Sequence, residues 1–296
     1  MRRSRLIFGR RALLAGAAAG FAVAPAVAAA TSHFFTTSDG VRLHYVMAGA
    51  QGPGIPTIVF VPGWCMPAWI FAPQIDALSR YARVVVLDPR GQGRSEVARS
   101  GYEPARRGRD IAELLARLGP GRMVLAGWSL GVLDVLSWLA TAGDRQLAGL
   151  VLIDNSVGEG TPPAGGGGSS FFTNLRRQRD RTTRGFVASM FKTPQSPAYL
   201  AALAHDAQIM PVESAIALLS YPRPREFWRN ALYSTRRPVL YAVTPKFREQ
   251  ASLVEQRHTD AVADLYPEAG HALFVDAAPR FNDAVADLLH RRAVWG

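Results

Sequence analysis

A serine flanked by glycines is the first candidate for chemistry in this sequence. Ser129 is the centre of the pentapeptide G-W-S-L-G at 127–131, with an apolar, strand-like run at 123–126 before it and an apolar, helix-like run at 132–139 after it. A strand, G-x-S-x-G and a helix in this order expose a nucleophilic serine on a sharp turn, which glycines allow because they have no side chains. We predict that Ser129 lies at the carboxyl edge of a parallel sheet, at the amino end of a helix, where backbone N–H groups favour negative charge.

A nucleophilic serine needs a base within hydrogen-bond reach, and that base needs an acid to orient it. His271 is the candidate base, because it lies in a loop between the predicted last strand, 262–266, and a final helix that begins at Pro279. A parallel sheet would bring that loop over Ser129. The other histidines fall in a predicted hairpin, in a predicted insertion or on surface-like helices: His33, His44, His205, His258 and His290.

The elements that would position these residues alternate between short apolar strands and amphipathic helices. Asp39-Gly40 between the strand-like runs 33–37 and 41–46 indicates a hairpin. Further strands are predicted at 57–61, 82–87, 123–126, 150–153, 238–243 and 262–266, with helices at 71–80, 110–118, 132–139 and from 279. This order predicts an α/β fold with a mostly parallel central sheet flanked by helices.

Residues from about 156 to 236 break the alternation. They lack clear strands and carry short, arginine-rich amphipathic segments. We predict a helical lid inserted between the sixth and seventh strands. Its larger apolar side chains would roof an apolar pocket; these are Phe171, Phe172, Phe186, Met190, Phe191, Met210 and Trp228.

The first thirty residues have the features of an export signal. A basic head that includes Arg10-Arg11 leads into an apolar run rich in alanine and glycine, and small residues follow up to Ala30. This pattern is typical of a removable twin-arginine signal. We therefore expect the export machinery as a partner, a periplasmic or secreted domain of residues 31–296, and no stable membrane anchor once the signal is removed.

Charge and cysteine content exclude several classes of function. The predicted signal holds five arginines and no acid, so the formal net charge of +11 falls to +6 without it. The remaining positive charge is scattered, which argues against a nucleic-acid partner. Cys65 is the single cysteine and excludes an intramolecular disulfide. Since no cysteine and histidine cluster has metal-ligand spacing, we expect neither a metal nor another cofactor.

Residues 31–296 resemble the α/β-hydrolase fold superfamily, in its branch of serine esterases and cofactor-free perhydrolases or haloperoxidases. The pentapeptide at 127–131, Gly270-His271, the D-P-R-G-Q-G-R-S loop at 88–95 and Pro62-Gly63-Trp64 carry the resemblance. By this resemblance, the backbone N–H groups of Trp64 and Leu130 would form the oxyanion hole. Pro62 stands where the family usually has a histidine that is not a member of the triad.

The triad acid is less clearly marked. The resemblance places it a few residues after the strand at 238–243, where this sequence has Phe247. Some members of the superfamily use an acid at the end of the preceding strand, which here is Asp154, and this is our prediction. Glu249 is the alternative acid, and Asp276 or no acid at all are the remaining possibilities.

The resemblance implies a serine hydrolase that cleaves carboxylic esters through an acyl-enzyme on Ser129, acting on a small-molecule ester or acyl substrate. The same triad would support a cofactor-free perhydrolase or haloperoxidase-like activity, or a C–C bond hydrolase. A non-catalytic, ligand-binding homologue is a further alternative, favoured by Phe247. A serine nucleophile argues against epoxide hydrolase and haloalkane dehalogenase activity, because those members of the superfamily use an aspartate.

Overall fold

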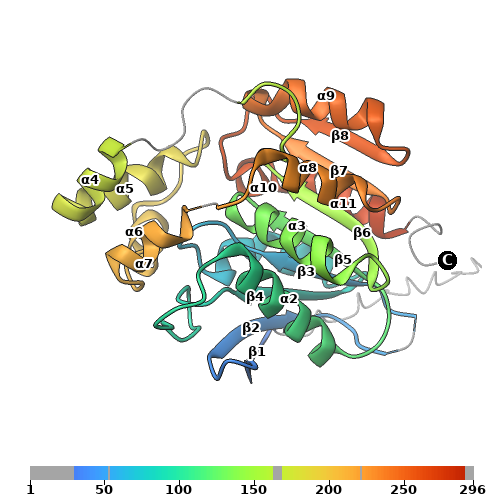
Figure 1. The fold of residues 1–296 in the computed structure, drawn as a ribbon, viewed down its shortest axis with the longest axis horizontal. Helices are drawn as coiled ribbons and strands as arrows, with labels where there is room; N and C mark the ends of the chain where they lie inside the picture. The colour runs from blue at the N-terminus through green and yellow to red at the C-terminus, as the bar shows by residue number, and fades with distance from the viewer. Residues whose placement is uncertain (1–29, 53, 163–168, 221, 291–296) are drawn as a thin grey trace, which may run out of the picture.

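A computed structural model describes residues 30–52, 54–162, 169–220 and 222–290. Within these residues, eight strands form one sheet in the order β1-β2-β4-β3-β5-β6-β7-β8 (Figure 1). The strands are β1 (Thr31–Thr36), β2 (Arg42–Ala48), β3 (Thr57–Val61), β4 (Arg83–Asp88), β5 (Met123–Trp128), β6 (Leu147–Ile153), β7 (Val239–Val243) and β8 (Ala261–Leu265). β2 pairs antiparallel with β1 and β4, and the other neighbours pair parallel. The predicted α/β-hydrolase fold class is confirmed.

The central strands are apolar on both faces because helices cover both sides of the sheet. Every residue of β3, β5, β6 and β7 is buried, and these strands read as continuous apolar runs. Such runs are typical of parallel strands in a doubly covered sheet. The edge strand β8, by contrast, is only partly buried.

The helices form two layers, one on each face of the sheet, and the strand order determines which face each helix covers. The step from β3 to β4 runs one way across the sheet, whereas the steps from β5 to β6 and from β7 to β8 run the other way. Because such crossovers are right-handed, α1 (Ala72–Leu78) covers one face, and α3 (Leu130–Ala142) and α9 (Arg248–Arg257) cover the other. The final helix α11 (Ala278–His290) packs against α1, and α2 (Pro104–Leu118) packs against α3.

The described residues between β6 and β7 form five helices. They are α4 (Ser169–Arg177), α5 (Arg179–Ser189), α6 (Pro197–Asp206), α7 (Val212–Leu218) and α8 (Arg225–Tyr233). Figure 1 shows α4 to α7 grouped beyond one end of the sheet. α8 instead packs against α3 and belongs to the flanking layer. The described part of the segment predicted as a lid at 156–236 is therefore mainly helical, but its last helix, α8, packs beside the sheet on α3.

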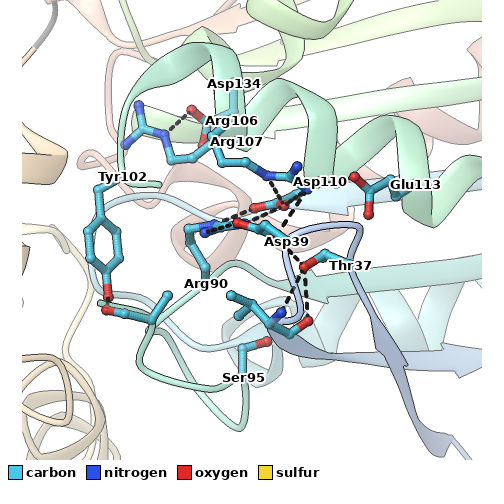
Figure 2. Close-up of polar contacts among 12 residues, drawn as sticks. Thr37, Asp39, Arg90, Ser95, Tyr102, Arg106, Arg107, Asp110, Glu113 and Asp134 are labelled. Atoms are coloured by element: carbon cyan, nitrogen blue, oxygen red, sulfur yellow. Dashed lines mark hydrogen bonds and ion pairs between the residues drawn. The ribbon is translucent and has the colours of Figure 1, made fainter. Parts of the chain in front are cut away.

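A buried ion network fixes the loop after β4 (Figure 2). The guanidinium of Arg90 is fully buried and makes two hydrogen bonds of 2.7 Å to the carboxylate of Asp110, while its third nitrogen lies 3.1 Å from Asp39. Arg106 also binds Asp110 and reaches Glu113 on the same helix. Paired and hydrogen-bonded charges of this kind tolerate burial. The network ties the β1–β2 hairpin, the loop 88–95 and α2 into one unit.

The described residues bear on two further expectations. No helix among them combines the length and apolar character needed to cross a membrane, and in this part of the chain no group of three or more histidine, cysteine, aspartate or glutamate side chains could hold a metal ion. Residues 1–29 of the predicted export signal lie outside the described residues, so that signal stays a prediction.

Candidate active site

Ser129 lies on the turn between β5 and α3, with a backbone conformation that serine rarely adopts. Its φ is 52° and its ψ is −120°, a strained region that is concentrated at functional sites. The flanking glycines are required by close backbone contacts. A Cβ on Gly127 would lie 2.4 Å from the carbonyl oxygen of Gly131, and a Cβ on Gly131 would lie 2.2 Å from that of Val61. The backbone therefore forces the Ser129 side chain out of the turn.

The loop after β3 passes directly beside Ser129. A Cβ added to Gly63 would lie 2.9 Å from the Cβ of Ser129. β3 and β5 are neighbours at the point where the direction of the strand order reverses, and the crevice at such a point is the usual ligand site of an open α/β sheet. Within the described residues, neither the Trp64 nor the Leu130 backbone N–H donates a hydrogen bond. Two backbone donors therefore remain available next to the serine.

Gln92 holds the Gly63–Cys65 turn in place. Its side-chain oxygen accepts a 2.6 Å hydrogen bond from the backbone N–H of Cys65, and its amide donates to the carbonyl of Gly63 at 3.1 Å. Gln92 belongs to the loop that Arg90 anchors to α2, so the ion network of Figure 2 supports this turn indirectly. Burial raises the pKa of the Cys65 thiol. Cys65 is therefore a protonated, apolar neighbour of the site rather than a competing nucleophile.

His271 and Asp154 form a hydrogen-bonded pair. Nδ1 of His271 lies 2.7 Å from Oδ2 of Asp154, and the other oxygen of Asp154 accepts the backbone N–H of Thr244 at 2.7 Å. Asp154 is buried and follows β6, whereas His271 is partly exposed in the loop after β8. Since a carboxylate only accepts hydrogen bonds, Nδ1 carries a proton, and in the neutral imidazole Nε2 is the nitrogen with the free lone pair.

Trp128 connects this pair to the serine turn. Its indole N–H donates a 2.9 Å hydrogen bond to the carbonyl oxygen of His271, and the two rings lie 5.3 Å apart. In the part of the chain that the structure describes, the Ser129 hydroxyl makes no hydrogen bond to His271. Such a bond often tightens only when substrate binds. Ser129 and His271 thus lie on two loops that Trp128 holds together.

The other predicted acids lie elsewhere. Glu249 accepts hydrogen bonds from the backbone and hydroxyl of Thr161, and Phe247 is part of the buried core. Asp276 accepts backbone N–H groups from Gly270 and Lys192, each at 2.7 Å. The carboxylate that meets His271 is therefore that of Asp154.

Sequence reasoning missed the contributions of Gln92 and Asp276. Gln92 could have been suspected, because it is a polar residue between two glycines in the loop at 88–95. Asp276 carried no such signal. Its hydrogen bonds to Lys192 and Thr193 join positions more than eighty residues apart, and only the folded chain shows them.

A cavity of about 470 Å³ lies beside the histidine and aspartate pair. Phe186 and Met190, from the end of α5, are the predicted roof residues that line it. Phe186 also packs edge-on against Trp64, with ring centroids 5.0 Å apart. Trp228 does not belong to this roof, because it lies on α8 and packs against Phe227. Of the inserted helices, α5 and the residues that follow it therefore form one wall of a cavity of mixed polar and apolar character.

Comparisons with known proteins agree with this architecture. The profile of the alpha/beta hydrolase family matches residues 58–284, and the chain belongs to this family. Its fold is similar to that of an esterase from Exiguobacterium antarcticum, with a TM-score of 0.75 and 20% identity over 88% of this chain and 99% of that one.

Two curated relatives are similar over shorter stretches. The chain is 27% identical over 173 residues to a soluble epoxide hydrolase of Corynebacterium sp. (strain C12), covering 51% of this chain and 59% of that protein. It is 33% identical over 121 residues to a non-heme haloperoxidase of Rhodococcus erythropolis, covering 40% and 43%. The chain thus spans about half the length of these relatives, whose different activities do not fix a substrate.

Proposed function

We propose that this protein is a serine hydrolase that cleaves carboxylic esters through an acyl-enzyme on Ser129. The observation that carries the proposal is the 2.7 Å contact between His271 and Asp154, which leaves a basic nitrogen next to a strained serine turn. In this proposal, Asp154 orients His271, and His271 is the general base for Ser129.

The proposed reaction has two steps. Nε2 of His271 takes the proton of the Ser129 hydroxyl, and the serine oxygen attacks the ester carbonyl. The N–H groups of Trp64 and Leu130 bind the resulting oxyanion. Each such donor matters to the rate, because removing one typically lowers kcat by about 10²–10³-fold. His271 then protonates the departing alcohol. Water, activated by the same histidine, releases the acid from Ser129.

A perhydrolase activity is the second candidate, supported by the likeness to the non-heme haloperoxidase. Hydrogen peroxide would replace water in the second step, and the acyl-enzyme would yield a peracid and free Ser129. Formation of peracetic acid from an acetate ester and peroxide, measured against hydrolysis of the same ester, tests this candidate. An epoxide hydrolase is not proposed, because Ser129 stands in place of the required carboxylate nucleophile. The ligand-binding alternative is favoured by Phe247, and the contact between Asp154 and His271 supports the catalytic proposal over it.

A kinetic assay with 4-nitrophenyl esters of increasing acyl length tests the main proposal. We expect saturable hydrolysis by the protein without residues 1–30, and a loss of at least 10³-fold in kcat for Ser129→Ala. A folded Ser129→Ala variant that retains wild-type turnover would refute the acyl-enzyme mechanism.

We also propose that the mature protein is periplasmic or secreted, on the evidence of the first thirty residues alone. Replacing Arg10 and Arg11 by lysine should retain the full-length precursor in the cytoplasm, because the twin-arginine pair is the recognised element. Cell fractionation measures this, and unchanged export of the double variant would contradict a twin-arginine route.

A further inference from the structure

The chain contains only two lysines among its thirty-four basic side chains, and the other thirty-two are arginines. These two, Lys192 and Lys246, are far apart in the sequence, yet both line the cavity beside His271 and Asp154. Lys192 follows α5, and Lys246 lies in the short 3-10 helix η2 (Pro245–Phe247) that follows β7. Both lysines of this protein therefore lie at the cavity beside the proposed base and acid.

The chain has arginine at each of the other thirty-two positions, and the two kinds of cation differ in what they can bind. An arginine offers a rigid, planar fork, whereas a lysine carries a compact charge on a flexible stem. A lysine can follow a charged group whose position varies between substrates. Arginines supply the buried ion network of Figure 2, in which fixed geometry is required.

The two lysine side chains contact neutral groups of the protein. Nζ of Lys192 donates a 2.8 Å hydrogen bond to the carbonyl oxygen of Pro267, and Nζ of Lys246 lies 5.3 Å from the ring centre of Phe247. Within the described residues, neither ammonium group forms an ion pair with a carboxylate. Both side chains are exposed, so both remain accessible to a ligand.

The carboxylates near the cavity make their hydrogen bonds to groups other than the two ammonium groups. Asp154 binds His271 and the Thr244 N–H, and Asp276 binds the backbone N–H groups of Gly270 and Lys192. The cavity therefore presents two ammonium groups that are not in ion pairs, beside the buried carboxylate of Asp154 and the histidine whose proposed task is ester hydrolysis. Exposed charges of this kind raise the local concentration of ligands of the opposite sign.

We propose that this cavity binds a negatively charged group of the substrate, with Lys192 and Lys246 as its counter-charges. The inference rests on the proposed esterase function and deepens it, since it names the substrate class as esters that carry a carboxylate or a similar anion. The charge is held away from the reacting carbonyl, and it selects among substrates rather than taking part in bond cleavage.

Two matched ester pairs test the inference. Mono-4-nitrophenyl adipate and its methyl ester differ by one charge on the acyl side, and 4-butyryloxybenzoic acid and its methyl ester differ by one charge on the alcohol side. The readout is the ratio of kcat/KM for the acid to that for its methyl ester. It is measured for the wild type, for the double variant Lys192→Gln/Lys246→Gln, and for Arg80→Gln, which removes an exposed charge at the end of α1 away from the cavity.

We expect the wild type to prefer the acid in at least one pair. The double variant should lower that ratio by about tenfold, since an exposed ion pair contributes up to a few-fold for each charge. Arg80→Gln should leave the ratio unchanged, and added salt should reduce the preference of the wild type. Equal kcat/KM for acid and methyl ester in both pairs, or an unchanged ratio in the double variant, would overturn the inference while leaving the esterase proposal intact.

A binding experiment separates the two proposals if no ester is hydrolysed. Calorimetry on Ser129→Ala, with and without the lysine substitutions, measures the affinity for the same acids and methyl esters. Tighter binding of an acid that depends on the lysines supports the anion site even where the esterase proposal fails. Equal affinities for acid and methyl ester reject it.

Discussion

The imidazole of His271 donates from Nδ1 to Oδ2 of Asp154 across 2.7 Å, although the two residues lie 117 positions apart in the chain. Asp154 follows β6, and the backbone N–H of Thr244, at the end of the neighbouring strand β7, holds its second oxygen. The carboxylate that contacts His271 therefore follows β6. The position after β7, where the resemblance places the acid, is occupied by Phe247. The proposed mechanism depends on this contact between His271 and Asp154.

Asp154→Asn should lower kcat by about 10⁴-fold, because an amide facing Nδ1 favours the wrong tautomer of His271. Hydrolysis of 4-nitrophenyl butyrate measures this effect. Glu249→Gln is the matched control, since Glu249 binds Thr161 and not the histidine. An Asp154→Asn enzyme with full activity would show that His271 needs no acid, or that another residue supplies it.

Gly63→Ala should lower kcat by about 10²-fold without unfolding the protein. The added methyl group would lie 2.9 Å from the Cβ of Ser129, so the turn that carries the Trp64 N–H must move. Gly185→Ala on α5 is the control. A Cβ there meets no atom within 4 Å, and alanine should stabilise the helix by about 0.5–1 kcal/mol. Wild-type kcat in Gly63→Ala would argue against an oxyanion site at this turn.

Asp276→Asn should lower both stability and activity. The carboxylate accepts hydrogen bonds from Gly270 and from the Lys192–Thr193 segment with both of its oxygens, and an amide would replace one oxygen by a donor that faces N–H groups. We expect a loss of about 1–3 kcal/mol in the free energy of unfolding in urea, and a lower kcat because the loop of His271 loosens. Asp283→Asn, at an exposed position of α11, should change neither quantity. Unaltered kinetics and stability in Asp276→Asn would exclude an anchoring role.

The ion network of Figure 2 predicts a loss of stability in acid. Burial raises the pKa of Asp39, but hydrogen bonds from Arg90 and Thr37 and the nearby charges outweigh it and lower the pKa from 3.8 to about 2. A carboxyl with a depressed pKa in the folded state stabilises the fold above the unfolded value of 3.8, and this contribution is lost as the pH falls toward 2.

Asp39→Asn should therefore destabilise the fold by about 1 kcal/mol at neutral pH, as expected for a partly exposed pair. Urea unfolding of wild type and variant between pH 6 and pH 2 measures the difference. The two free energies of unfolding should converge as the pH approaches 2. A constant difference across this range would contradict the assignment of the effect to the Asp39 charge.

The sheet was predictable because its signals are local. Runs such as Val84–Leu87 and Leu150–Ile153 are apolar throughout, and their alternation with helices indicates a parallel sheet covered on both faces. The serine turn was predictable for the same reason, since glycines on both sides of Ser129 mark it. His271 was predicted from its loop after the last strand, and Asp154 was predicted from the resemblance to superfamily members whose acid follows the preceding strand. Their catalytic roles stay predictions.

Other features depend on tertiary contacts that leave no local pattern. α8 has the same arginine-rich, amphipathic character as α4, yet α8 packs on α3 while α4 lies beyond the end of the sheet. The docking of Asp276 onto Lys192 and the meeting of two distant lysines at one cavity are equally invisible before the chain is folded.

Labelling with a fluorophosphonate, followed by peptide mass spectrometry, is the most direct test of the central claim. The reagent bonds only to a serine that a neighbouring base activates. We predict one adduct per chain on Ser129, rapid labelling in the wild type, much slower labelling in His271→Ala, and no adduct in Ser129→Ala. An unlabelled wild-type protein, or an adduct that maps to another residue, would contradict the account.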